Sequence, residues 1–131
     1  MRLSRYLFGS FIVIMLGFLL SAPVHAAGFV SQTSGTAAAL RAVYFRDASI
    51  GLAVGDGGAI RKTLNGGSTW TTSLSGTTFG LKDVSIVPGT SIAYVVGEGG
   101  VIRKSIDLGT GWSSQTSGTG ETLTGVYFAD A

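Results

Sequence analysis

Two basic dipeptides, Arg61-Lys62 and Arg103-Lys104, are the residues of this 131-residue chain best suited to binding a ligand. A guanidinium group donates a fork of N–H groups that matches the two oxygens of a carboxylate, so such pairs suit an acidic group on a peptide. Each dipeptide follows a Gly-Gly turn at the same distance. The alternative is internal salt bridging with Asp56, Glu98 and Asp107, which lie close in sequence, and the sequence leaves both open.

The remaining polar residues do not suggest catalysis. The chain has no cysteine and one histidine, His25, so its serines and threonines lack an activating base. Asp56 and Glu98 occupy equivalent glycine-rich turns, which hairpin geometry explains better than a cation site. We therefore expect no catalytic residue, no metal and no cofactor.

The composition indicates a small folded β-rich domain. Hydrophobic residues make up 45% of the chain and charged residues 12%, with 21 glycines, which is unlike a disordered chain. The net charge of +2 comes from Arg2 and Arg5, because the rest of the chain carries seven basic and seven acidic side chains. This balance argues against a nucleic-acid partner.

The first 26 residues have the layout of a secretory signal peptide. Arg2 and Arg5 precede an apolar run at residues 6–20, and small residues follow at Val24 and Ala26. We expect cleavage after Ala26, with cleavage one residue later as an alternative, leaving an exported chain of residues 27–131 in the periplasm or outside the cell. The other alternative is a retained anchor, but the run is shorter than the roughly 20 apolar residues of a spanning helix, so we expect no stable membrane span.

The exported part repeats with a period of 41 to 42 residues. Gly35, Gly76 and Gly118 are spaced by 41 and 42 residues, and Trp70 and Trp112 by 42. Each unit predicts a four-stranded meander. The predicted first strands are residues 40–45, 81–86 and 123–128, the second 50–55 and 92–97, the third 59–63 and 101–105, and the fourth begin at residues 69 and 111. This period and strand number are typical of a β-propeller blade.

The predicted turn between third and fourth strands has a recurring pattern that resembles an Asp-box. In an Asp-box a hydroxyl residue, an Asp, a Gly and an aromatic residue at fixed spacing form a hairpin. A short polar side chain accepts backbone N–H groups across such a turn, and the indole packs beneath it. Asn65 replaces the expected Asp in the first copy, and Gly111 the expected Thr in the second. The predicted structural residues are Thr63, Asn65, Gly67 and Trp70 in the first box, and Ser105, Asp107, Gly109 and Trp112 in the second.

The two boxes, with the preceding segments at residues 54–62 and 96–104, make the chain similar to the photosystem II stability and assembly factor family over about residues 31–131. This resemblance implies an exported or lumenal β-propeller that binds client membrane-protein segments without catalysis. It also implies client contact by surface arginines, which by match to the motif are Arg61 and Arg103. We therefore expect Arg61, Lys62, Arg103 and Lys104 to bind a client protein or peptide.

The repeats amount to about two and a quarter blades. We expect units at about residues 34–75 and 76–117 and the start of a third at residues 118–131, whereas a closed propeller takes four or more blades. We expect either further C-terminal blades in a longer protein or a homo-oligomer. A fragment of a sialidase-like or glycan-binding Asp-box propeller is an alternative, although Tyr44, Tyr94 and Tyr127 fall on repeated strands where packing explains them better than a nucleophile. A structural surface array is a third possibility.

Overall fold

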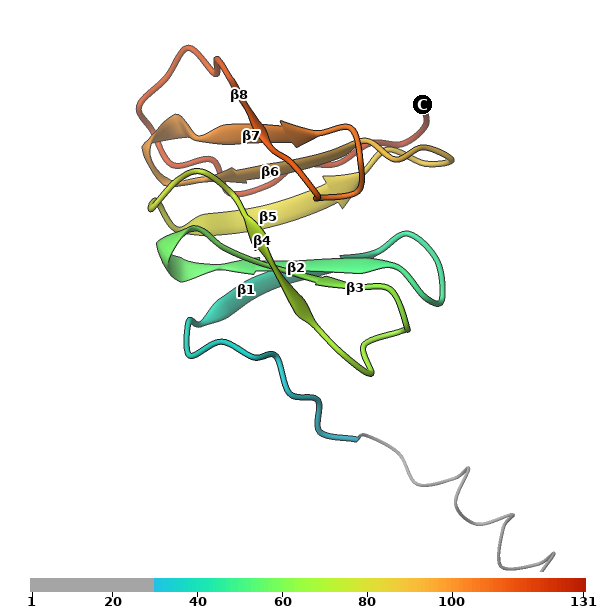
Figure 1. Ribbon diagram of the computed structural model, residues 1–131. Coiled ribbons are helices and arrows are strands. Elements are labelled where there is room, and N and C mark those ends of the chain that lie inside the picture. Colours follow the sequence, from blue (N-terminus) through green and yellow to red (C-terminus); the bar gives the residue numbers. More distant parts are fainter. Residues whose placement is uncertain (1–29) are drawn as a thin grey trace, which may run out of the picture. The chain divides into compact units, whose positions relative to one another are not determined.

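The computed structural model describes residues 30–131, so the expected leader at residues 1–26 lies outside the described part. The described residues form two four-stranded antiparallel sheets, in each of which consecutive strands pair (Figure 1). Blade 1 contains β1 (Leu40–Phe45), β2 (Gly51–Gly55), β3 (Ala59–Thr63) and β4 (Thr71–Leu74); blade 2 contains β5 (Leu81–Ile86), β6 (Ala93–Gly97), β7 (Ile102–Ser105) and β8 (Ser113–Gln115). The expected four-stranded meanders are confirmed. In residues 30–131 no helix has the length and apolar character to span a membrane.

Three predicted strands differ from the structure by more than one residue. The fourth strands begin two residues later than expected, at Thr71 and Ser113, because side-chain hydrogen bonds hold the preceding residues in the turn. The predicted first strand of a third unit, residues 123–128, is not part of a sheet. It lies against blade 2, where the Leu123 N–H donates to the Gly97 carbonyl at 3.0 Å. A strand needs a hydrogen-bonded neighbour, and the described residues supply none on its other side.

The turns between second and third strands depend on glycine. Asp56–Gly58 and Glu98–Gly100 form short 3-10 turns, and the last glycine of each has a positive φ, 75° at Gly58 and 68° at Gly100. A Cβ at Gly58 would lie 2.0 Å from the Thr77 carbonyl oxygen. Only glycine combines this backbone conformation with so close an approach of the following segment.

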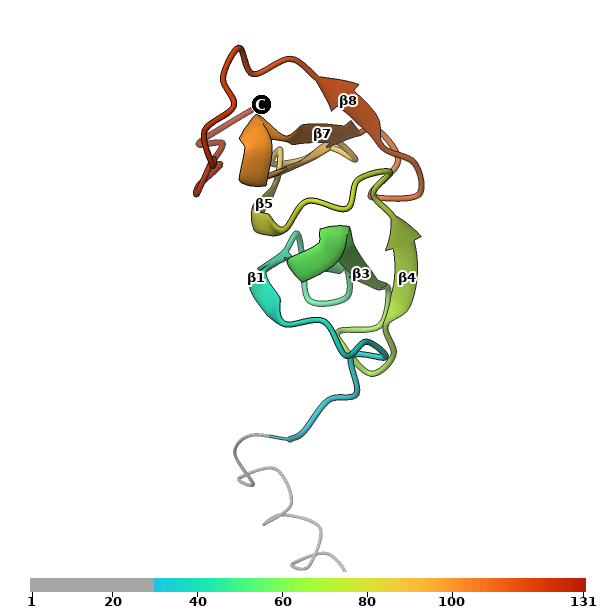
Figure 2. The same cartoon turned by 90° about the vertical axis from the view of Figure 1, so that its left-hand side faces the viewer.

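The hydrophobic core lies between the two sheets. Leu52, Val54 and Ile60 of blade 1 contribute one side of it. Blade 2 contributes the other side through Leu81, Val84, Ile86, Ala93 and Val95. Figure 2 shows the two sheets adjacent to each other, with β4 and β8 along the same side. Each sheet thus obtains its buried surface from the other, as expected for stacked repeats.

Strand pairing separates the two faces of blade 1. Val43, Ala53, Arg61 and Thr72 are successive cross-strand partners and share one face, because side chains alternate along a strand. Leu52 lies on the opposite face, in the core between the blades. We call the face with Val43 the open face, since no described element of a further sheet covers it.

The second Asp-box hairpin also joins the two blades. The indole of Trp112 packs against the core, and its Nε1 donates to Ser73 Oγ of blade 1 at 2.8 Å. Ser73 Oγ in turn donates to the Gly109 carbonyl. Trp70, at the equivalent position in blade 1, instead meets Phe45 edge to face with 6.0 Å between ring centroids. Trp112 therefore stabilises the inter-blade contact, whereas Trp70 lies on the open face.

These positions predict unequal effects for two matched substitutions. We expect Trp112→Ala to lower the free energy of unfolding by about 3 kcal/mol, because it removes core packing and leaves Ser73 without its indole donor. Trp70→Ala should cost about 1 kcal/mol, since it removes mainly one aromatic pair. Urea titrations in dilute solution, followed by circular dichroism, measure both. Equal losses would contradict the assigned role of Trp112.

Candidate functional site

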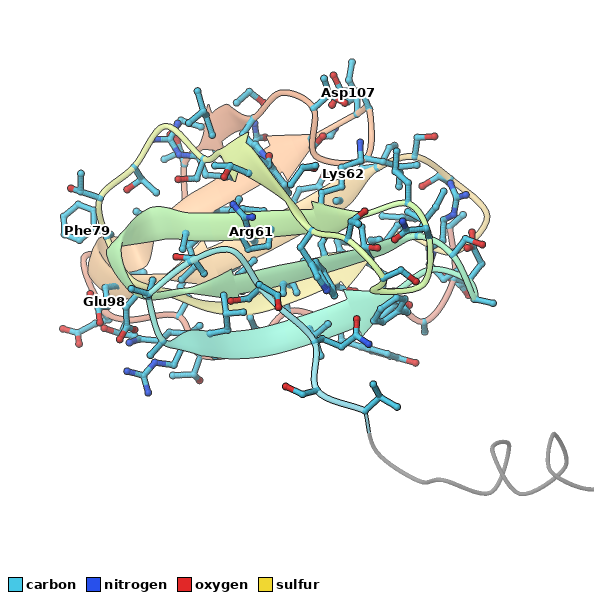
Figure 3. The ribbon with its side chains drawn as sticks, turned by 60° about the horizontal axis from the view of Figure 1, so that its bottom comes forward. Arg61, Lys62, Phe79, Glu98 and Asp107 are labelled. Carbon is cyan, nitrogen blue, oxygen red and sulfur yellow. The ribbon has the colours of Figure 1, made fainter. Side chains whose placement is uncertain are left out.

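Arg61 is buried within blade 1, so its expected position on the molecular surface is wrong. Its side chain is 7% exposed. Its Nε donates to the Ser34 carbonyl at 2.6 Å, Nη2 donates to the Trp70 carbonyl at 2.8 Å, and Nη1 donates to Thr72 Oγ1. Figure 3 shows the residue over the middle of blade 1. All three nitrogens are occupied by the chain itself, so Arg61 ties the segment before β1 to strands β3 and β4.

Arg103 occupies the equivalent position in blade 2 and keeps unused donors. Its Nη2 donates to the Gly76 carbonyl at 2.5 Å, which matches the contact between Arg61 and the segment before blade 1. Its Nε is buried and has no hydrogen-bond partner among the described residues. A buried N–H without a partner is costly, and an acceptor brought by a ligand would remove that cost.

A groove of about 760 Å³ borders Arg103. Its walls include the outer strand β4 and the linker that follows, with two exposed apolar side chains, Leu74 at 82% and Phe79 at 51% exposure. Figure 3 shows Phe79 projecting at the edge of the molecule near Glu98. Small polar groups complete the lining, with Thr72, Ser73 and Thr77 among them. A guanidinium group beside exposed apolar side chains suits a peptide with an apolar residue and a carboxylate.

The two lysines lie on the opposite faces of their strands from the arginines. Lys62 Nζ donates to Thr110 Oγ1 of the second hairpin at 3.3 Å. Lys104 Nζ lies 5.7 Å from the centroid of the Tyr94 ring, within range of a cation–π interaction. Adjacent residues of a strand point to opposite faces, so the predicted basic pairs are split between the two faces of each blade. Sequence reasoning missed this split, although the alternation of strand side chains could have revealed it.

The turn acids have other partners than the predicted arginines. Asp56 forms a bidentate pair with Arg41, with Nε to Oδ1 at 2.8 Å and Nη2 to Oδ2 at 2.5 Å. Glu98 pairs with Lys82 at 2.7 Å and also accepts the Gly80 N–H. These contacts lower the pKa of both carboxyl groups, chiefly through the hydrogen bonds from Arg41 and Lys82. The acids therefore stabilise the turns and leave Arg103 without a carboxylate partner among the described residues.

The two hairpins at residues 63–70 and 105–112 use the hydrogen bonds expected of the turn motif. In the second, Asp107 Oδ1 accepts from Ser105 Oγ at 2.7 Å and from the Thr110 and Gly111 N–H groups at 3.0 and 2.9 Å. In the first, Asn65 Oδ1 accepts from Thr63 Oγ1 and the Thr69 N–H. Thr63 Oγ1 and Ser105 Oγ also accept the N–H groups of Gly67 and Gly109. All of these bonds serve the hairpins themselves.

The comparisons with known proteins identify a similar solved structure. No protein-family profile matches the chain, and no curated protein matches it either. A solved structure described as YCF48 bound to D1 peptide is similar at 26% sequence identity with a TM-score of 0.54, over 62% of this chain. The chain spans about a quarter of that structure's length, since the match covers 26% of it. The likeness supports a β-propeller fold like that of the photosystem II factor family, and the expected all-β propeller blades are confirmed.

The second hairpin predicts an acid-sensitive contribution to stability. The Gly111 N–H, the Ser105 hydroxyl and the Thr110 N–H lower the pKa of Asp107. A carboxyl group whose pKa is lower in the folded state stabilises the fold above its unfolded pKa of about 3.9, and this contribution disappears as the pH falls through the folded value. Asp107→Asn should therefore reduce the fall in melting temperature between pH 5 and pH 3.

The first hairpin provides the matched control for this prediction. Asn65→Asp places a carboxylate at the equivalent turn position, where it should add an acid-sensitive contribution that the native residue lacks. Melting temperatures by circular dichroism across this pH range test both variants. An unchanged pH dependence in Asp107→Asn would show that other carboxyl groups dominate acid unfolding.

Proposed function

We propose that this chain is a noncatalytic β-propeller scaffold that binds a client peptide, with the groove beside Arg103 as the binding site. The observation that carries this proposal is that Arg103 lines that groove while its buried Nε lacks a partner among the described residues. The similar solved structure supports a peptide as the ligand, because its description states that YCF48 is bound to D1 peptide.

The chemistry of the groove specifies the client. Leu74 and Phe79 present apolar surface, and Arg103 offers N–H donors to an acceptor. A peptide in extended conformation with a leucine or phenylalanine near a carboxylate satisfies both requirements. Arg61 does not take part, since its donors are used within blade 1. Lys62 and Lys104 belong to the opposite faces of their strands and are not part of this site.

The sialidase-like alternative receives less support from the same residues. Tyr44 packs against the core and Tyr94 stacks against Phe128 with 5.0 Å between ring centroids. Tyr127 is largely exposed. A glycosidase of that type needs a tyrosine, acids and arginines together, whereas Arg61 is buried beside Ser34 and Trp70. We therefore propose peptide binding over glycan cleavage.

Peptide capture tests this function. The probes are a fluorescent hexapeptide with a penultimate phenylalanine and a free terminal carboxylate, and its amidated counterpart. Arg103→Gln should weaken binding of the acid probe by about tenfold, because it removes a charge-assisted hydrogen bond. Lys104→Gln, which removes the neighbouring charge on the other face, should leave affinity unchanged. Fluorescence anisotropy measures the affinities. If Arg103→Gln binds each probe as tightly as the native chain does, the assignment is refuted.

We also propose that the chain acts after export, in the periplasm or outside the cell. The basis is the basic, apolar and small-residue order of residues 1–26. Expression of the whole chain in an exporting bacterium should give a product that begins at Ala27. Intact mass of the protein recovered from the periplasm or the medium measures this directly. A product that retains residues 1–26 would contradict it.

A further inference from the structure

The open face of blade 1 exposes apolar residues whose counterparts in blade 2 are buried. Leu40, Val43 and Phe45 of β1 are 38%, 59% and 41% exposed. The equivalent residues of β5, which are Leu81, Val84 and Ile86, are 0%, 2% and 0% exposed. The repeat positions are the same and the side chains are similar. The difference arises because blade 1 covers β5, whereas no described blade covers β1.

The open face is also hollowed and largely apolar. A groove of about 420 Å³ runs over it, lined by Leu40, Ala42, Val43, Ala53 and Trp70 together with Gln32, Ser34 and Arg41. The two charged groups nearby already have partners in the chain, because Arg41 pairs with Asp56 and Arg61 is hydrogen-bonded throughout. The face therefore favours an apolar sheet surface over a charged ligand.

The chain itself contains the surface that fits such a face. Blade 1 covers β5 with β1 and β2, where Leu52 and Val54 correspond to Tyr94 and Val96 of blade 2. The β1 residues that pack on the core, Ala42 and Tyr44, correspond to the polar residues Asp83 and Ser85. Residues 123–128 now lie on this second surface. Phe128 stacks on Tyr94, and the Val126 N–H donates to Asp83 Oδ2 at 2.9 Å.

The segment at residues 123–128 has the same pattern as β1. Its sequence is Leu-Thr-Gly-Val-Tyr-Phe, and that of β1 is Leu-Arg-Ala-Val-Tyr-Phe. Leu40, Val43 and Phe45 thus correspond to Leu123, Val126 and Phe128. The surface of blade 2 that accepts the segment is therefore chemically suited to accept β1 of another molecule.

We propose that the open face of blade 1 is a self-association surface that docks onto blade 2 of a second copy, with β1 of the incoming copy taking the place of residues 123–128. The contact continues the interface between blade 1 and blade 2 from one molecule to the next. Residues 123–128 hold their place as a single segment outside any sheet, whereas the incoming β1 brings a complete sheet and buries more apolar area. Residues 123–128 belong to the same chain as the surface they cover, so they compete with the incoming β1 at a high effective concentration. Association therefore depends on protein concentration.

Sedimentation equilibrium of the exported chain tests the proposal. The native protein should associate as its concentration rises, and Val43→Glu should remain monomeric with an unchanged circular dichroism spectrum in dilute solution. Ile106→Glu makes the same type of change at an exposed position on the second hairpin and should associate like the native chain.

Phe128→Ala weakens the contact of residues 123–128 with blade 2 and should lower the concentration of half-association by about threefold. A native protein that stays monomeric up to about 1 mM, a dissociation constant that corresponds to only about 4 kcal/mol of binding, would overturn the proposal.

A cross-linking experiment tests the docking geometry even if Val43→Glu fails to fold. The chain has no cysteine, so single cysteines report only the intended contact. A mixture of Phe45→Cys and Tyr94→Cys proteins should form a mixed disulfide under mild oxidation, because Phe45 takes the place of Phe128 beside Tyr94. A mixture of Leu64→Cys and Tyr94→Cys proteins is the control and should not, since Leu64 is exposed on the first hairpin. Equal cross-linking in both mixtures would overturn the proposed geometry.

Discussion

Burial of aliphatic side chains between two sheets is the interaction on which the rest of this structure depends. A four-stranded sheet has two faces, and blade 1 buries only the face with Leu52, Val54 and Ile60. The partner surface comes from blade 2, so neither blade has a core of its own. This dependence explains why the same sequence pattern gives buried apolar residues in β5 and partly exposed ones in β1. In such a repeat, exposure is set by the neighbouring unit as much as by the residue itself.

Arginine supplies the polar counterpart of this packing. Arg61 donates to the Ser34 carbonyl and Arg103 to the Gly76 carbonyl, and both bonds join residues that are 27 apart in the chain. Each guanidinium therefore reaches the segment that precedes its own blade. The two guanidinium groups differ in their hydrogen bonding. All three nitrogens of Arg61 have partners, whereas Arg103 Nε has none among the described residues. Only one of the two copies of this repeated residue thus keeps a donor without a partner among the described residues.

The sequence predicted the elements of the fold well and the environment of its polar residues poorly. Periodicity located the strands, because the glycine turns and the hairpin motif recur at fixed spacing and depend on local geometry. It did not locate the partners of Asp56 and Glu98, which pair with Arg41 and Lys82 across neighbouring strands. It also treated Arg61 and Arg103 as equivalent and exposed. They differ because Arg61 also donates to the Trp70 carbonyl and Thr72 Oγ1, and a repeat pattern contains no information about such contacts.

The two proposed surfaces are physically independent. The groove beside Arg103 lies along β4 and its following linker, whereas the self-association face is built on β1 and Trp70. The two surfaces also differ in polarity. Arg61 lies on the open face because side chains alternate along a strand, but its donors bond to the chain itself, so that face remains apolar. Association through β1 would therefore leave Arg103 accessible, and each added copy would contribute another client groove. A scaffold of this kind would gain avidity for a client with several acidic segments from repetition, without a change in any single site.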